Sequence, residues 1–295
     1  LITIGYEDYN YYLTTSKGKY CVKIFNKFRT NEDINNYLNR IRVVANSNIN
    51  APKPLLVDGD ISLSLDYENN HYDICVFEYI NGKNFFELKQ KTSKYEIEEL
   101  ARQTAMINNL DIKPNFIYDT WAIINFEEEY KQKRIYLEKY YQKEFDNLLK
   151  ELQNIDFDKL PKAFVHGDII NTNVMKDNNS KIWIIDFAVS NYLPRIIDLA
   201  VISCNMCLDE SSEQTTIDNI TTLLTEYNKY NQLTEYELQT FWTFYKLANA
   251  MHILQPIFIA KTEEDSEENQ YWLNEGKIGY SYSCKEKITN ILIKR

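Results

Sequence analysis

Residues 163–187 read AFVHGDIINTNVMKDNNSKIWIIDF, and this stretch decides the fold that we expect for the chain. Its apolar runs are short and bounded by polar residues, which is typical of β-strands, and DNNSK has the composition of a turn. The polar loop HGDIINTN lies between two of these strands. Because loops that rigid strands hold in place often carry catalytic and binding residues, we expect the chemistry here.

Outward from this stretch, helical periodicity dominates the sequence after residue 80. Apolar residues recur at helical spacing, and acidic residues occur in the first turns, over residues 93–110, 125–153, 213–230 and 234–256. We therefore predict that residues 81–295 form a larger, mostly helical lobe that encloses the short central strands.

Before residue 80 the pattern is that of a small β-sheet with one helix. Alternating and β-branched residues around the turn SKGK predict a hairpin within residues 1–28, and SLSLDY and YDICVFEYI predict two more strands. Between them, TNEDINNYLNRIRVVANSN has a capping residue, Thr30 or Asn31, followed by apolar residues at helical spacing. We predict an α+β fold in which residues 1–80 form a small antiparallel lobe.

The composition is that of a folded protein and argues against nucleic acid as a partner. Of 295 residues, 44% are hydrophobic and 26% are charged, which is ordinary for a globular chain. The net charge is -10, from 33 basic and 43 acidic residues, and no cluster of Lys and Arg offsets it. Such a charge repels phosphate backbones and favours cationic ligands.

Five scattered cysteines indicate free thiols in a reducing compartment. Cys204 and Cys207 form a CxxC motif in an apolar run that we interpret as helix, and a metal or redox role is the alternative. No apolar stretch approaches the roughly 20 residues of a membrane span, and the opening LITIGYEDYN lacks a signal-peptide pattern. We predict a cytoplasmic protein without a membrane partner. Because Leu1 stands where Met is expected, the start of the protein is left open.

Three residues of the central stretch match the requirements of phosphoryl transfer. That reaction needs a hydroxyl positioned in line and metal ions that neutralise charge on the phosphates. Asp168 and, five positions later, Asn173 lie on one short loop, and Asp186 ends the strand IWIID. Kinases use these residue types in this order, first for the acceptor hydroxyl and then for magnesium. Each residue alone has a simpler explanation, because Asp and Asn often cap turns.

The motif HGDxxxxN, followed by a strand that ends in IDF, resembles the catalytic loop of the aminoglycoside phosphotransferase, choline kinase and type II homoserine kinase superfamily. The resemblance implies a protein-kinase-like fold with ATP or GTP and Mg²⁺ as cofactors. It also implies that Asp168 is the catalytic base and that Asn173 and Asp186 are the magnesium ligands. Downstream, PRIIDLAVI resembles the family's DLA helix, whose aspartate, here Asp198, supports the catalytic loop. We expect His166 to brace the loop rather than to act as a base.

The segment before residue 30 resembles the nucleotide-binding part of the same family. Lys23, in the strand KYCVKIF, resembles the lysine that holds the α- and β-phosphates, and a solvent-facing strand lysine is the alternative. The segment IGYEDYNYYL resembles the family's GxExxNYxL loop, in which Gly5 would allow the backbone to approach phosphate. Protein kinases have three glycines in the corresponding loop, whereas this chain has one.

Two further contacts to the nucleotide follow from the resemblance. A helix glutamate normally pairs with the strand lysine, and Glu32 is our candidate, although acidic residues also favour helix N-termini for electrostatic reasons. The segment FEYINGK resembles the hinge, where the backbone groups of Glu78 to Ile80 would meet adenine.

Together these motifs predict an enzyme, an ATP-dependent kinase that phosphorylates a hydroxyl of a small molecule. The N-terminal pattern favours homoserine or a choline-like amino alcohol, and the HGD motif fits an aminoglycoside equally well, so the acceptor stays open. A protein acceptor is disfavoured because no segment ending in APE follows Asp186. The alternatives from other classes are a catalytically silent nucleotide-binding scaffold and a binding module for a cationic ligand.

Residues 205–275 are where we expect the acceptor to bind. They contain the acidic run TEEDSEEN and several acidic and aromatic residues, namely Asp209, Glu210, Trp242, Tyr245 and Trp272. An acidic, aromatic-lined cleft would suit an amine-bearing acceptor. A solvated acidic loop beside tryptophans of the core is the alternative.

Overall fold

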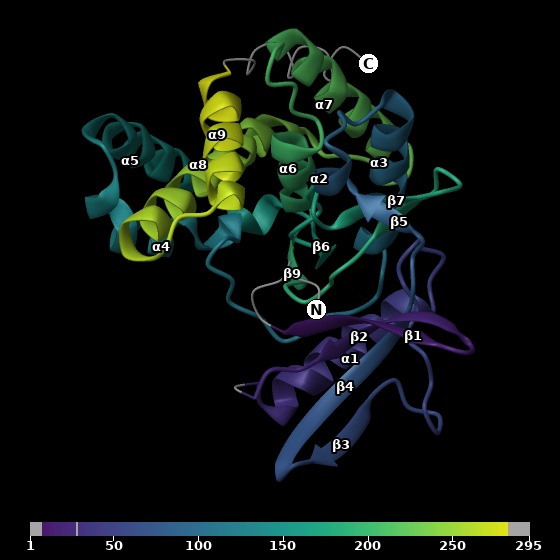
Figure 1. Cartoon of the computed structure of the whole chain (residues 1–295). Coiled ribbons are helices and arrows are strands. Elements are labelled where there is room, and N and C mark those ends of the chain that lie inside the picture. The colour runs from purple at the N-terminus through teal and green to yellow at the C-terminus, as the bar shows by residue number, and fades with distance from the viewer. Residues whose placement is uncertain (1–7, 28, 283–295) are drawn as a thin grey trace.

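The N-terminal part of the chain forms a four-stranded sheet (Figure 1). The structure is a computed structural model that describes residues 8–27 and 29–282. The strands run in the order β1-β2-β4-β3, and neighbours are antiparallel throughout. Their bounds are Tyr9–Thr15 for β1, Gly18–Ile24 for β2, Leu63–Tyr67 for β3 and Asn70–Glu78 for β4. The hairpin predicted around SKGK is therefore confirmed as β1 and β2.

Helix α1 (Asn31–Ala45) packs against this sheet (Figure 1). It begins with a capping box, in which the Thr30 hydroxyl accepts from the Asp33 N–H and the Asp33 carboxylate accepts from the Thr30 N–H. On the sheet side of the helix, the Tyr37 ring centroid lies 5.5 Å from the Lys23 ammonium group. Lys23 therefore points toward α1, on the sheet face that borders the pocket described below.

Two small antiparallel sheets hold the central stretch in place. One has the order β5-β7-β8 and the other pairs β6 with β9. Their bounds are Gly82–Asn84 for β5, Lys162–Val165 for β6, Val174–Asp177 for β7, Ile182–Ile184 for β8 and Asn191–Pro194 for β9. Val165 lies opposite Asn191, and Val174 lies opposite Ile184. The same two residue pairs thus bracket the loops 166–173 and 185–190, which brings both predicted catalytic segments together.

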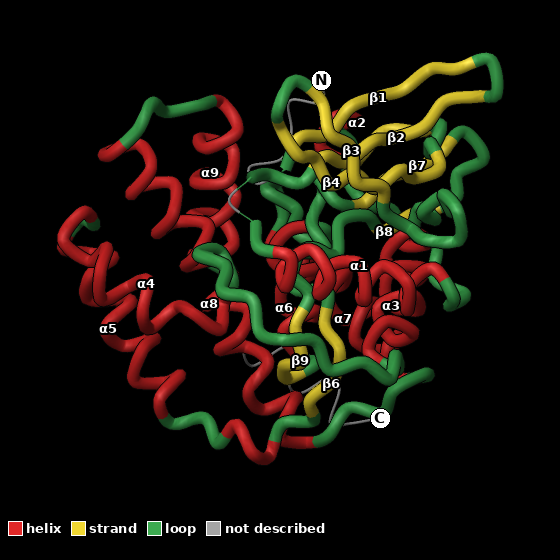
Figure 2. The backbone as a smooth tube through the Cα atoms, turned by 90° about the horizontal axis from the view of Figure 1, so that it is seen from below, coloured by secondary structure: helices red, strands yellow, loops and turns green. Residues whose placement is uncertain are grey.

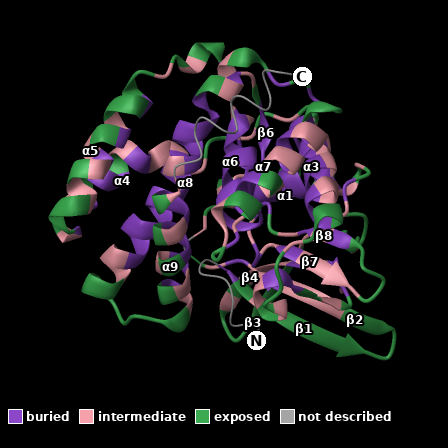
Figure 3. Ribbon diagram, turned by 90° about the horizontal axis from the view of Figure 1, so that it is seen from above, coloured by how far each residue is buried: buried purple, intermediate pink, exposed green. Residues whose placement is uncertain are grey.

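The rest of the chain is mostly helical, as Figure 2 shows by colour. The helix bounds are Phe85–Leu88 for α2, Lys94–Asn108 for α3, Phe126–Lys133 for α4, Lys139–Gln153 for α5, Ile196–Asn205 for α6, Glu213–Asn228 for α7, Glu235–Thr262 for α8 and Glu267–Ser281 for α9. Every residue of α6 is buried, so this helix is the centre of the helical part (Figure 3). Within the described ranges, no helix is long and apolar enough to cross a membrane.

The α+β fold class is confirmed, and three helical details differ from the prediction. The pattern over 125–153 is divided into α4 and α5 by a 3₁₀ turn at 134–136. Helix α8 continues to Thr262 through Pro256, because a proline within a long buried helix removes only one backbone donor. Helix α9 was not predicted, since the acidic run before it resembles a solvated loop; Ser266 caps this helix by accepting from the Asn269 N–H.

Two glycines allow α9 to pack closely against α8. A Cβ atom at Gly276 would lie 2.7 Å from the His252 Cβ, and one at Gly279 would lie 1.9 Å from the Asn249 Oδ1. At Gly276 the added atom would also lie 2.8 Å from the His252 backbone carbon, so this position needs glycine, whereas at Gly279 the Asn249 amide would have to move. This close approach fixes the position of α9 against α8.

A buried arginine links α1 to the helical part. The Arg40 Nε donates to the Ser190 carbonyl at 2.9 Å, and its Nη2 donates to the Asn115 carbonyl at 3.0 Å. Burial lowers the pKa of Arg40 to about 10. Both contacts cross from the sheet layer to loops beside the central strands, so the position of α1 depends on those loops.

Candidate active site

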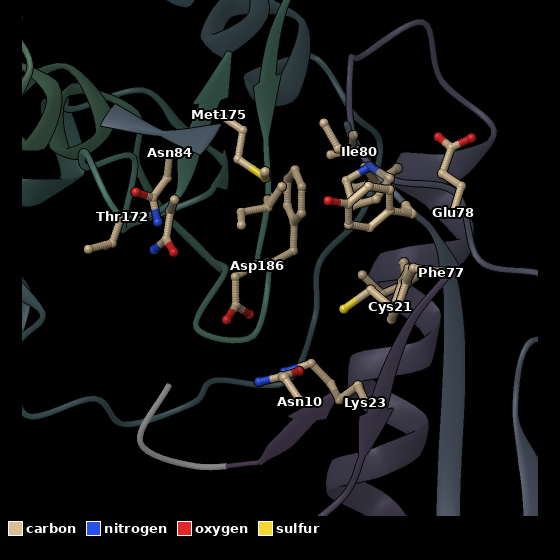
Figure 4. Close-up of a pocket in the computed structure, with 18 of the residues that line it drawn as sticks. Asn10, Cys21, Lys23, Phe77, Glu78, Ile80, Asn84, Thr172, Met175 and Asp186 are labelled. Atoms are coloured by element: carbon tan, nitrogen blue, oxygen red, sulfur yellow. The ribbon is translucent and has the colours of Figure 1, made fainter. Parts of the chain in front are cut away.

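One pocket brings together five of the predicted site residues (Figure 4). It lies between the four-stranded sheet and the central strands, and it is lined by side chains of both. The predicted residues on its wall are Lys23, Glu78, Ile80, Asn173 and Asp186. In Figure 4 the Asp186 carboxylate faces the interior of the pocket, and Lys23 enters from the strand side.

Asp198 and His166 support the catalytic loop from behind. The Asp198 carboxylate accepts from the backbone N–H of Gly167 at 2.8 Å and of His166 at 3.1 Å, and from the Asn108 amide at 2.9 Å. Burial raises the pKa of Asp198 to about 6, against the effect of these donors. Gly167 has φ +83°, a conformation that favours glycine, so the loop turns sharply just before Asp168.

His166 is a neutral brace in this arrangement. It is fully buried, and this burial lowers its pKa to about 4. Its Nδ1 accepts from the Asp168 N–H at 3.2 Å, which leaves Nε2 to donate to the Ile185 carbonyl at 3.0 Å. The imidazole therefore ties the loop after β6 to the segment after β8.

Asp168 has the properties of a base that works near neutral pH. Its carboxylate accepts from the Asn173 amide at 2.6 Å, and the same amide donates to the Asp168 carbonyl at 3.0 Å. Burial raises the pKa of Asp168 to about 7, and the negative charges of Asp119 and Asp186 add to this effect. A carboxyl group with such a pKa can both accept a proton and release it at physiological pH.

Asp186 is held in a strained conformation with its carboxylate in the pocket. Its φ of +62° lies in the left-handed region, which a residue with a side chain adopts rarely. The Ala188 N–H donates to its Oδ1 at 3.2 Å. Desolvation opposes ionisation of this carboxylate, but the Lys23 charge and the Ala188 donor hold its pKa below the usual range. Asp186 is thus an ionised carboxylate at the edge of the pocket.

Asp8, and not Glu32, pairs with Lys23. The Asp8 Oδ2 lies 3.5 Å from the Lys23 ammonium, and the same carboxylate accepts from the Arg29 Nε at 2.7 Å and Nη2 at 3.0 Å. Glu32 instead accepts from the Asn115 amide at 3.1 Å on the exposed first turn of α1. The predicted Glu32–Lys23 pair is therefore corrected, because Glu32 is exposed at the start of α1 whereas the Asp8 carboxylate lies beside Lys23.

The end of the pocket that contains Ile80 and Met175 is suited to a flat aromatic base. The Ile80 carbonyl accepts from the Gly82 N–H at 3.0 Å, and within the described ranges the Ile80 N–H has no hydrogen-bond partner. The Glu78 side chain turns away and accepts from the Lys53 N–H. Apolar side chains from both layers, including Met175 of β7, line this end (Figure 4). Gly5, predicted to approach phosphate, lies outside the described residues.

The oxygen atoms at Asn173 and Asp186 fit a hard divalent cation. The Asn173 amide nitrogen is used by Asp168, and in the described part of the chain no donor is bonded to its Oδ1. Asp186 likewise keeps one carboxylate oxygen without a backbone donor. Amide and carboxylate oxygens are the ligands that Mg²⁺ prefers, and Mg²⁺ usually keeps further positions for water and phosphate.

The CxxC motif is part of the core and not of this site. Cys204 and Cys207 are buried free thiols, and burial raises the pKa of both. Among residues 8–27 and 29–282, no group of three or more His, Cys, Asp or Glu side chains could hold a metal ion.

Three charged residues near the site were not identified from the sequence. Asp8 and Arg29 flank Lys23, and the charge of Asp119 acts on Asp168. Asp8 lies within IGYEDYNYYL, so the motif pointed to its neighbourhood without distinguishing its carboxylate from that of Glu7. Asp119 lies in an irregular segment that carries no motif.

This arrangement is that of a phosphotransferase on a protein-kinase-like fold, with a sheet-and-helix layer above a catalytic loop and a helical part. The chain belongs to the phosphotransferase enzyme family, whose model matches residues 1–227. The predicted recognition, fold class and assignment as an enzyme are confirmed.

Solved structures support the same fold. The amicoumacin kinase hAmiN in complex with AMP-PNP, Ca²⁺ and Ami is 19% identical, with a TM-score of 0.68 over 97% of this chain and 86% of that chain. A microcompartment-associated aminopropanol kinase is 12% identical, with a TM-score of 0.65 over 98% and 91%. The choline kinase LicA from Streptococcus pneumoniae is 16% identical, with a TM-score of 0.60 over 93% and 90%.

Proposed function

We propose that this protein transfers the γ-phosphoryl group of ATP to a hydroxyl of a small molecule. The observation that carries the proposal is the hydrogen-bonded pair of Asp168 and Asn173 beside a pocket that also contains Asp186 and Lys23. Kinase chemistry requires these residue types within reach of one another. The division into a lobe of residues 1–80 and a lobe of residues 81–295, and a cytoplasmic location, belong to the same proposal.

The nucleotide would lie along the pocket with its base near Ile80 and its phosphates near Lys23. The Ile80 N–H supplies one donor to a ring nitrogen of adenine, and Met175 packs against the ring. Lys23, held by Asp8, supplies positive charge for the phosphates, and Arg29 lies on the same carboxylate. Several structures with this fold contain AMP-PNP, ADP or AMP, which supports ATP rather than GTP as the donor.

Asp168 performs the proton transfer in this proposal. It hydrogen-bonds the acceptor hydroxyl and takes its proton as the oxygen forms a bond to the γ-phosphorus and the bond to the ADP oxygen breaks. Asn173 keeps the Asp168 carboxylate oriented through its amide nitrogen. Asn173 Oδ1 and Asp186 would hold Mg²⁺, which when bound neutralises charge on the phosphates.

The acceptor is expected to be a small hydroxylated molecule, either an amino alcohol, such as homoserine or a choline-like compound, or an aminoglycoside. Structures with this fold include kinases named for aminopropanol, choline and amicoumacin. A net charge of -10 is compatible with a cationic acceptor and unfavourable for nucleic acid.

Acceptor-dependent consumption of MgATP tests the proposal. The panel holds homoserine, choline, 2-aminoethanol, amino sugars and aminoglycosides, and the variants are Asp168→Asn and, as a matched control, Asp111→Asn at an exposed position. We expect at least one acceptor to stimulate turnover in the wild type and the control, and a loss of about 10²-fold or more in Asp168→Asn. Equal turnover in Asp168→Asn would refute the role of Asp168. Tight MgATP binding without turnover would favour the silent scaffold.

A further inference from the structure

The four-stranded sheet has two different faces, because side chains alternate along each of its strands. Side chains on one face line the pocket, among them Asn10, Cys21 and Lys23. Tyr11 and Val22 alternate with these residues, so they point to the other side of the sheet, where they lie opposite each other. We call this side the outer face. It carries the odd-numbered residues of β1 and β3 and the even-numbered residues of β2 and β4.

Apolar side chains run across the outer face from one edge strand to the other. Tyr11 lies opposite Val22, and Val22 lies opposite Val76 on its other side. In the neighbouring row, Ile74 lies opposite Leu63. An antiparallel sheet that covers a core on one side usually carries polar residues on the side that faces water. The outer face instead has the composition of a surface that a second layer covers.

The large side chains of the two edge strands leave much apolar surface open to solvent. They are 37–60% exposed, and β1 is coloured as exposed in Figure 3; the residues are Tyr9, Tyr11, Leu13, Leu63, Leu65 and Tyr67. Together they expose on the order of 500 Å², since a fully accessible tyrosine presents roughly 200 Å². The largest apolar patch of a typical monomer is about 300–600 Å², and a stable interface takes about 800 Å² from each partner. The half-buried side chains of β2 and β4, between the edge strands, extend the outer face toward that size.

Charged side chains lie only at the ends of the outer face, as far as the described residues of its four strands show. The Lys27 ammonium lies 5.6 Å from the centroid of the Tyr72 ring at one end. Glu78 stands at the other end, where its carboxylate accepts from the Lys53 N–H. Protein interfaces are enriched in tyrosine and depleted of charge at their centre. The outer face has this composition.

The distribution of charge favours a second copy of this chain as the partner. A surface whose centre has no charge cannot attract an acidic or basic protein by electrostatic complementarity. An anionic lipid surface would be attracted by clusters of Lys or Arg, whereas this chain has a net charge of -10. A second copy presents an equally apolar sheet, and two sheets pack face to face at about 10 Å. Twofold symmetry makes such a contact self-complementary and closes the assembly at two copies.

We propose that the protein forms a twofold dimer in which the outer faces of two copies pack against each other. Each copy keeps its own pocket, because the pocket borders the opposite face of the sheet. Lys23 lies between Val22 and Ile24 on β2, so the contact supports from behind the strand that carries Lys23. The dimer is independent of the reaction proposed for the pocket.

The oligomeric state of the whole protein tests this proposal. Sedimentation equilibrium between about 0.1 and 50 μM should show twice the mass of the chain, with a dissociation constant of about 1 μM or lower. Because the contact is apolar, we expect the dimer to persist as NaCl is raised to about 1 M, where interactions between exposed charges are screened. A protein that is still monomeric at the highest concentration would refute the dimer. Dissociation by salt would refute an apolar contact.

Two variants place a charge on the outer face from its two edges. Leu65→Glu on β3 and Tyr11→Glu on β1 should each raise the dissociation constant about 100-fold or more, because the dimer would bury an unpaired carboxylate. Both positions are exposed in the single chain, so we expect both variants to keep the wild-type circular dichroism spectrum. Ile135→Glu is the matched control, since Ile135 is 78% exposed in the turn between α4 and α5, and it is expected to dimerise normally.

The pattern across the variants identifies the contact. Loss of the dimer in both sheet variants, with Ile135→Glu unaffected, would support packing through the outer faces. Loss in Tyr11→Glu alone would mean that the copies pair along the edge of β1, and the proposal would be wrong. A dimer that neither variant weakens would use another surface, which also refutes it. A monomeric wild type that sediments with phosphatidylcholine vesicles would assign the outer face to lipid instead.

Discussion

The substitution Asp168→Asn should stabilise the nucleotide-free protein at neutral and alkaline pH while it abolishes turnover. Asp168 is an ionised group in a poor environment, because burial and the charges of Asp119 and Asp186 oppose its negative charge. Asparagine removes that charge and keeps an oxygen that accepts from the Asn173 amide. Residues that serve a reaction are often unfavourable for folding in this way.

The magnitude follows from the pKa of Asp168. The rise from 3.8 to about 7 corresponds to about 4 kcal/mol at a pH above both values. Because the side chain is half-buried and water reaches it, we expect about half of this, about 2 kcal/mol. For a chain of this length, that free energy is equivalent to a rise in Tm of about 4 °C.

The direction of the pKa shift determines how the stability difference between the wild type and Asp168→Asn changes with pH. The folded-state pKa of Asp168 is raised above the unfolded value, so protonation of this group stabilises the fold, and the wild type loses that stability as pH rises from about 4 to about 7. Asp168→Asn does not titrate there, so its advantage should be absent near pH 4 and constant above pH 7.

Thermal unfolding between pH 4 and pH 9, with EDTA and without nucleotide, measures this difference. Asp111→Asn, at an exposed position, is the control and is expected to follow the wild type. A difference that does not change with pH, or a wild type that is more stable than Asp168→Asn at pH 8, would refute the reasoning.

Three further predictions concern the base, the lysine and the packing of α9. In steady-state kinetics between pH 5.5 and 9, kcat/KM for the acceptor should rise with pH and level off above an apparent pKa of about 7, because Asp168 must be ionised to accept a proton; a flat profile would contradict its role as base. Asp8→Ala should lower kcat about tenfold with little change in KM for MgATP, since Lys23 keeps its charge but loses the carboxylate that positions it; unchanged kcat would contradict that role. Gly276→Ala should cost about 1–3 kcal/mol in urea unfolding, because the added Cβ would lie 2.7 Å from the His252 Cβ; an unchanged midpoint would show that α9 can shift freely.

The central stretch made most of the fold predictable. Short apolar runs around HGDIINTN predicted short strands, and the structure pairs these strands so that they bracket both loops that carry Asp168 and Asp186. The spacing of five residues between Asp168 and Asn173 is what lets the two side chains meet across one loop. The catalytic and metal-binding roles of these residues remain predictions.

The remaining features depend on contacts between distant segments. Asp8 reaches Lys23 because it lies at the start of β1, which pairs with β2, whereas the family resemblance directed the prediction to Glu32 on α1. Helix α9 is preceded by an acidic run that hides its periodicity, so its packing against α8 could not be foreseen. Periodicity identifies a helix, but not which of its polar residues another helix will cover.

The Arg40 contacts matter for any experiment in which the chain is expressed as two separate fragments. A fragment of residues 1–80 would contain the complete four-stranded sheet and α1, but not the carbonyls of Asn115 and Ser190 that hold the Arg40 guanidinium. The complementary fragment would in turn lack the arginine that satisfies those carbonyls. The Arg40 guanidinium therefore couples the two parts of the chain, because each part keeps these buried hydrogen bonds only while the other is in place.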